Sequence, residues 1–174
     1  EIGVRLVGSE MCIRDRIQTF SAIKKNGKKS NKILLMELAS KIVNKMMSND
    51  SFSKWLGIEI IELSEGFCKL QMKIRDDMTN GFKIAHGGIT YSLADSALAF
   101  ASNSNGFQSL TIESSINYFK KVNSGDILSA ITNEINKTEK IAKYSIVVSN
   151  QNNEKIASFN GKVHRTQKQW FAED

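Results

Sequence analysis

The chain has 174 residues, of which 41% are hydrophobic, and this size and composition fit one globular domain with a sizeable core. No apolar run in the sequence is long enough to span a membrane. The net charge of +6 does not indicate a nucleic-acid-binding face, because five lysines in one short segment supply most of it: Lys24, Lys25, Lys28, Lys29 and Lys32.

The N-terminal segment divides into two parts, neither of which we assign to the domain. Residues 1–16, EIGVRLVGSEMCIRDR, resemble a translated sequencing-library adapter, so we exclude them from the fold prediction. Residues 17–32 carry the lysines and are expected to form a flexible basic tail, with a targeting or membrane-surface role as the weaker alternative. Cys12 lies in the adapter-like part, which leaves Cys68 without a disulfide partner. A lone cysteine is typical of a reducing compartment, so we expect a cytoplasmic protein.

Two helices are expected before the first strand. Residues 33–50 should hold an amphipathic helix, because apolar residues recur there at helical spacing (Leu34, Leu35, Leu38, Ile42 and Met46). The polar break at residues 48–51 can cap a second, short helix whose Phe52, Trp55 and Leu56 face inward. Gly57 should end that helix.

A strand hairpin, a long helix and four further strands follow. Residues 58–63 and 67–74 are strand-like around a Ser-Glu-Gly turn. The long helix should run from Gly87 or Gly88 to about Ser102, where Asn and Gly residues stop it. Beyond Gly106, Leu110, Ile112, Ile116 and Tyr118 are expected on one face of a strand, with Ser114 in register. The remaining strands are predicted over residues 127–135, 143–149 and 156–165, which gives an α+β layout with an antiparallel sheet.

The long helix has two unusual features. Its Gly87-Gly88 start leaves backbone N–H groups accessible to another molecule. Its middle carries Asp95 among apolar residues, where an unpaired carboxylate costs several kcal/mol. Asp95 could instead face solvent, but Tyr91 and Leu98 one turn away leave little room for a polar stripe.

The stretch HGG-x4-LADSALAFASNSNG resembles the signature of hotdog-fold acyl-CoA thioesterases of the phenylacetate-degradation (PaaI) type. That family has an Asn, then His-Gly-Gly, then an Asp nine residues after the His. Asn80, His86 and Asp95 stand at these positions. The resemblance runs from about residue 51 to 165 and departs at residues 123–126, where the family usually has Pro-Gly. It implies a hotdog domain over residues 51–166, a curved sheet wrapped around one central helix, followed by a C-terminal tail over 167–174.

Thioester hydrolysis gives the residues of this stretch specific roles. Gly87 would stabilise the developing oxyanion with its backbone N–H at the positive end of the helix dipole, and Gly88 would leave room for the acyl group. Asp95 would activate water as a general base or attack as a nucleophile, and the sequence leaves both open. The resemblance adds Asn80 to position water or the carbonyl and His86 to shape the loop. Taken alone, His86 fits a structural histidine better than a site residue, and Asn80 fits a turn residue equally well.

The distance between these groups requires a second copy of the chain. Gly87 and Asp95 are eight residues apart on one helix, which separates them by roughly 12 Å along its axis. One thioester cannot contact both from the same chain, since catalytic contacts are near 3 Å. We therefore expect a homodimer with Gly87 of one subunit facing Asp95 of the other, and the resemblance implies the same, with a tetramer also possible. Paired sheet edges would support that assembly.

The remaining assignments are weaker. Thr111 lies near the position where some relatives place a hydroxyl beside the carboxylate. Lys162 and Arg165, with His164, could bind the phosphates of coenzyme A, although a solvated strand end explains them better. No dinucleotide loop or metal-spaced cluster is present, so no metal or cofactor is expected beyond the coenzyme A of the substrate. The predicted activity is hydrolysis of aryl- or medium-chain acyl-CoA. The alternatives are a hotdog module that binds acyl-CoA without turnover and a hotdog dehydratase, for which a paired Asp/His motif is lacking.

Overall fold

The computed structural model describes residues 33–171, so the predictions for residues 1–16 and 17–32 lie outside the described chain. A first helix covers residues 33–49 and is followed by α2 (Ser51–Leu56). Then come β1 (Glu59–Ser64), β2 (Phe67–Lys73), a 3-10 turn (Asp76–Met78) and α3 (Gly87–Asn103). The last four strands are β3 (Phe107–Tyr118), β4 (Ile127–Lys137), β5 (Ile141–Ser149) and β6 (Lys155–Gln169). No helix in this described part is both long and apolar enough to cross a bilayer.

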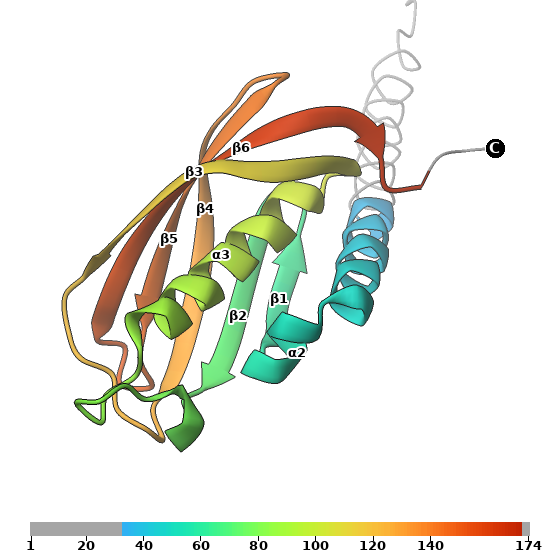
Figure 1. The fold of residues 1–174 in the computed structure, drawn as a ribbon. Helices are drawn as coiled ribbons and strands as arrows, with labels where there is room; N and C mark the ends of the chain where they lie inside the picture. Colours follow the sequence, from blue (N-terminus) through green and yellow to red (C-terminus); the bar gives the residue numbers. More distant parts are fainter. Residues whose placement is uncertain (1–32, 172–174) are drawn as a thin grey trace, which may run out of the picture. The chain divides into compact units, whose positions relative to one another are not determined.

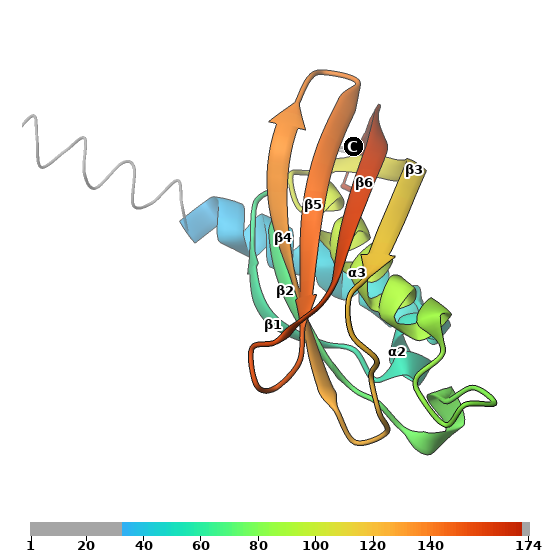
Figure 2. The same cartoon turned by 90° about the vertical axis from the view of Figure 1, so that its left-hand side faces the viewer.

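The six strands form one antiparallel sheet with α3 packed along one face (Figures 1 and 2). Their order is β1-β2-β4-β5-β6-β3, so β1 and β3 are the two edges. The sheet curves around α3, and the helix preceding α2 is the additional N-terminal helix. This arrangement confirms the predicted α+β hotdog fold.

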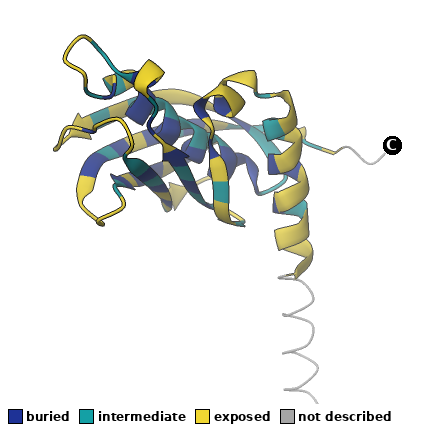
Figure 3. Ribbon diagram, turned by 90° about the horizontal axis from the view of Figure 1, so that it is seen from below, coloured by how far each residue is buried: buried dark blue, intermediate teal, exposed yellow. Residues whose placement is uncertain are grey.

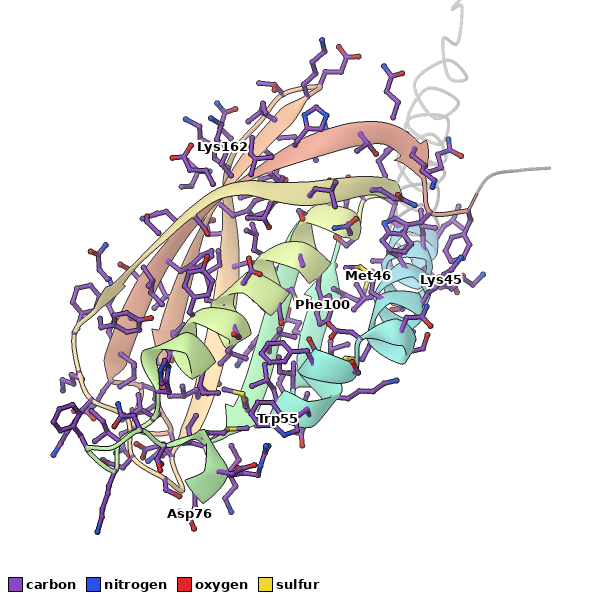
Figure 4. All side chains as sticks on the ribbon, in the orientation of Figure 1. Lys45, Met46, Trp55, Asp76, Phe100 and Lys162 are labelled. Atoms are coloured by element: carbon purple, nitrogen blue, oxygen red, sulfur yellow. The ribbon has the colours of Figure 1, made fainter. Side chains whose placement is uncertain are left out.

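The core lies between α3 and the curved face of the sheet (Figure 3). The strand residues that face it alternate with exposed ones, as in β5, where Ala142, Tyr144, Ile146 and Val148 are all buried. Phe100 of α3 is almost fully buried, and Met46 of the first helix packs against the same core (Figure 4). The predicted cap and stop of α2 are confirmed, because Asp50 accepts the N–H of Ser53 at 2.9 Å and Gly57 is left-handed, with φ of 72°. Leu56 is buried as predicted, but the prediction that Phe52 and Trp55 face inward is wrong, since they are 52% and 47% exposed.

The face assignment predicted for β3 is wrong for Leu110, because a bulge between Thr111 and Glu113 changes the alternation, whereas Ser114 and Ile116 share a face as predicted. Residues paired directly across two strands share a face. Thr111 pairs with buried Val163 and Ser114 with buried Gly161, whereas Leu110 pairs with exposed His164 and is itself 64% exposed. The extra residue in the bulge therefore brings both Thr111 and Ser114 to the α3 side, although they are three positions apart in the sequence.

The last strand is longer than predicted. β6 continues past Arg165 to Gln169, which pairs with Phe107 at the beginning of β3. Trp170 then donates its indole N–H to Oδ1 of Asn103, at the end of α3, over 2.9 Å. Residues 167–169 are thus part of the sheet instead of the tail, because the start of β3 offers them a pairing partner.

Gly161 on β6 lies directly against α3, and a larger residue there should destabilise the protein. A Cβ on Gly161 would lie 2.3 Å from Cδ2 of Leu98, whose side chain is fully buried. Overpacking of this kind costs about 1–3 kcal/mol. We expect Gly161→Ala to lower the free energy of unfolding by that amount in chemical denaturation. Gly81→Ala is the control, since a Cβ there meets nothing within 4 Å; equal stability of the two variants would contradict the prediction.

Candidate active site

The loop before α3 is held by its own backbone and by two predicted site residues. Asn80 accepts the N–H of Phe82 through Oδ1 at 2.9 Å, so its carboxamide oxygen is part of a turn. His86 is the N-cap of α3, and its Nδ1 accepts the N–H of Gly88 at 3.0 Å. This bond requires Nδ1 to be unprotonated. In this chain, therefore, Asn80 and His86 both have identifiable structural roles.

The two glycines that begin α3 differ in what their N–H groups do. The N–H of Gly88 is taken by His86. The N–H of Gly87 has no acceptor among residues 33–171. Since Gly87 is the first residue of α3, its N–H is an orphan donor at the positive end of the helix dipole. This makes it the donor available to an oxygen atom of a ligand.

A line of polar contacts joins α3 to β3, and we call it the α3–β3 seam. Its helix members are spaced four residues apart, except that Ala99, which has no polar side chain, stands between the last two. They are Gly87, Tyr91, Asp95 and Asn103. On the strand they are Tyr118, Ser114, Thr111 and Ser109. Helix residues four positions apart are neighbours on the helix surface, so successive members lie next to one another, and the β3 bulge keeps their strand partners in line.

The steps on both sides of Asp95 are hydrogen-bonded between the helix and the strand. The hydroxyl of Tyr118 donates to the carbonyl oxygen of Gly87 at 2.8 Å. The hydroxyls of Tyr91 and Ser114 are bonded to each other. At the far end, Oδ1 of Asn103 accepts the N–H of Ser109 at 2.9 Å, and its amide donates back to the Ser109 carbonyl at 3.1 Å.

Asp95 is half-buried, and its Oδ1 makes no hydrogen bond with any residue that the structure describes. Burial raises the pKa of the Asp95 carboxyl above its ordinary value, and the Thr111 side chain beside it lowers the pKa in part. A buried acceptor without a partner is costly, and native proteins retain such groups mainly at functional sites. The predicted alternative, Asp95 facing bulk solvent, does not fit this burial.

The other predicted substrate contacts lie on β6 and are already engaged. Lys162 pairs with Glu113 across the β3–β6 ladder at 3.5 Å, and it projects from the side of the sheet away from α3 (Figure 4). Arg165 donates from Nη1 to the carbonyl oxygen of Thr138 at 2.7 Å, in the β4–β5 turn. The fold therefore brings Thr111 close to Asp95. It does not bring Lys162 or Arg165 to these two residues. Their proposed contact with coenzyme A stays a prediction.

Cys68, the cysteine within residues 33–171, does not offer a competing nucleophile. Cys68 is fully buried on β2, and burial raises the pKa of its thiol to about 12. The thiol therefore stays protonated and enclosed, whereas a nucleophilic cysteine needs its thiolate. Within residues 33–171 no three His, Cys, Asp or Glu side chains gather in a way that could hold a metal ion.

Two residues of the site were not predicted from the sequence. Tyr118 was placed only on a strand face, yet its hydroxyl reaches the first residue of α3. Tyr91 was noted only as a neighbour of Asp95, and it bonds Ser114. The spacing of four residues from Gly87 to Tyr91 to Asp95 was visible in the sequence and could have indicated the helix side of the seam.

Comparison with known proteins identifies the family of this chain. Residues 82–157 match the thioesterase superfamily. The acyl-coenzyme A thioesterase PaaI of Escherichia coli is 37% identical over 120 residues, covering 69% of this chain and 86% of the relative. A putative esterase of Archaeoglobus fulgidus is 38% identical over 129 residues, covering 74% and 84% respectively.

Solved structures show the same relationship. The E. coli PaaI structure superimposes with a TM-score of 0.76 and 34% identity, covering 78% of this chain and 98% of its own. A Streptococcus mutans protein solved with acetyl-CoA bound has a TM-score of 0.62 and 26% identity, covering 64% and 90%. The predicted resemblance is thereby confirmed, and this chain belongs to the thioesterase superfamily as a relative of the PaaI acyl-CoA thioesterases.

Proposed function

We propose that this protein hydrolyses the thioester of aryl- or medium-chain acyl-CoA to a free acid and coenzyme A. The observation that carries the proposal is the half-buried Asp95 carboxyl with one unpartnered oxygen in the middle of α3. Membership of the thioesterase superfamily supports thioester hydrolysis as the reaction class. The acetyl-CoA bound to the S. mutans protein supports an acyl-CoA substrate.

The proposed reaction uses the two free groups of α3. As a general base, Asp95 takes a proton from water while the water oxygen bonds to the thioester carbon. The oxygen of the former carbonyl becomes negative and accepts the N–H of Gly87. Collapse then breaks the C–S bond, and the coenzyme A thiolate takes the proton held by Asp95. As a nucleophile, Asp95 would instead bond to the thioester carbon and expel the coenzyme A thiolate, which leaves a mixed anhydride. Water then hydrolyses the anhydride, which regenerates the Asp95 carboxylate, releases the acid and supplies the proton that the thiolate takes up.

The assembly belongs to the same proposal. Gly87 and Asp95 are the first and ninth residues of α3, so roughly 12 Å separates them along the helix axis. We propose a homodimer, or a tetramer built from dimers, in which these groups come from different subunits. The position of β3 supports this arrangement, because it is an edge strand with an unpaired backbone on one side and carries exposed apolar side chains such as Leu110 and Ile112, which are 64% and 53% exposed.

The proposed function is tested by the release of free thiol from a panel of acyl-CoA substrates. The panel pairs benzoyl- and phenylacetyl-CoA with medium-chain acyl-CoA, and acetyl-CoA serves as the short reference. We expect turnover of the aryl or medium-chain members. Saturable binding of these compounds without thiol release would instead identify an acyl-CoA-binding module and overturn the hydrolase assignment.

A further inference from the structure

One peptide unit at the start of α3 is held from both sides. The peptide that joins Gly87 to Gly88 accepts the Tyr118 hydroxyl on its carbonyl oxygen at 2.8 Å. Its N–H donates to Nδ1 of His86 at 3.0 Å. The two partners come from different directions, since His86 precedes the helix and Tyr118 lies at the end of β3, which runs past the helix start (Figure 1).

This part of the backbone needs external support. Glycine lacks the Cβ that restricts φ and ψ, so two glycines in succession are the most variable way to begin a helix. The first turn of a helix also lacks intrahelical acceptors for its N–H groups. Without a clamp, the plane of the Gly87–Gly88 peptide could rotate, and the orientation of the adjoining Gly87 N–H would change with it.

We propose that Tyr118 is a positioning residue that, together with His86, fixes the Gly87 backbone so that its free N–H points at the oxyanion. The inference rests on the proposed hydrolysis. A donor contributes to catalysis only when it is already oriented toward the position where charge develops. Tyr118 does not contact the reacting atoms itself, because its hydroxyl is used on the carbonyl side of the next peptide.

The environment of Tyr118 keeps its hydroxyl a donor. Burial, and then the neighbouring Tyr91, raise the pKa of Tyr118 above its ordinary value of 10.0. The hydroxyl therefore remains protonated throughout the neutral range. The contact also places the hydroxyl oxygen 3.3 Å from where a Cβ on Gly87 would stand, so Tyr118 closes the space that a side chain at Gly87 would enter.

Tyr118→Phe tests the proposal, because it removes one oxygen and keeps the ring. Tyr118 is 50% exposed, so the variant should fold. We expect kcat for the best acyl-CoA substrate to fall about tenfold or more, within the range for a misplaced catalytic group, while KM changes less than about twofold. The melting temperature should stay near that of the wild type.

Tyr144→Phe is the control, since its hydroxyl donates to Glu134 on β4 at 2.7 Å and makes no hydrogen bond to any described residue of α3. It should keep the wild-type kcat. Equal kcat values for Tyr118→Phe and the wild type would overturn the positioning role, as would a fall in kcat that Tyr144→Phe reproduces. Absence of hydrolysis by the wild type would instead refute the proposed function itself, so the two failures are distinguishable.

Discussion

Asp95→Asn is expected to lower kcat for acyl-CoA hydrolysis at least about a hundredfold, the usual effect of losing a general acid or base. The amide cannot take a proton from water and cannot attack the thioester carbon. Its size matches that of the carboxyl, so the packing of α3 should be unchanged. Thiol release measures the rate, and acyl-CoA binding to the variant by calorimetry shows whether the pocket persists.

The same variant should be more stable than the wild type near neutral pH. The pKa of Asp95 is raised in the folded chain, so the folded state binds this proton more tightly than the unfolded chain does. The free energy of unfolding therefore falls as pH rises from the ordinary Asp95 pKa of 3.8 through the raised pKa of the folded chain. The neutral Asn avoids this loss. The melting temperature of the variant should exceed that of the wild type near neutral pH, and the difference should shrink as pH falls toward 3.8.

Asp77→Asn provides the comparison for both measurements. This exposed carboxylate pairs with Arg75 at 3.1 Å on the surface, where an ion pair contributes about 0–1 kcal/mol. Its conversion to Asn should leave hydrolysis unchanged and should not raise the stability. If Asp95→Asn retained hydrolysis within a few-fold of this control, Asp95 would have no part in the reaction.

The central helix and its carboxylate could be predicted from the sequence because both follow from local chemistry. Gly-Gly at one end, Asn and Gly at the other and an apolar run between them specify α3. Asp95 attracts notice because a carboxylate is costly in such a run. The structure then adds what the sequence could not show, an oxygen of that carboxylate without a partner among the described residues.

Features that depend on contacts across the sheet were not predictable in this way. The bulge at Thr111 and Glu113 breaks the two-residue period on which the face assignment of β3 relied. Its position depends on the pairing of β3 with β6, which no local pattern reveals. The end of β6 was missed for the same reason, because Gln169 is in a strand only through its partner Phe107. Arg165 likewise looks like a free cation in sequence, yet it is bonded to the β4–β5 turn.

Complementation between two inactive variants is the strictest test of a site shared between two subunits. Gly87→Val places a branched side chain beside the oxyanion donor, in the space next to the Tyr118 hydroxyl. It should abolish hydrolysis as Asp95→Asn does. When the two chains are co-expressed, a mixed dimer would hold one site with Gly87 from one chain and Asp95 from the other. That site is intact, whereas the second site of the pair carries both defects.

Random pairing makes half of the dimers mixed, and each mixed dimer has one working site out of two, so the mixture should recover about a quarter of the wild-type activity. Either variant alone should stay at about one percent or less. The control mixes Asp95→Asn with a chain carrying both substitutions, which leaves no intact site in any pairing. If tagged chains co-purify and yet activity stays at the level of that control, each site is formed within one chain. Because a single straight α3 cannot bridge the roughly 12 Å between Gly87 and Asp95, that result would also show that these two groups do not act on the same thioester.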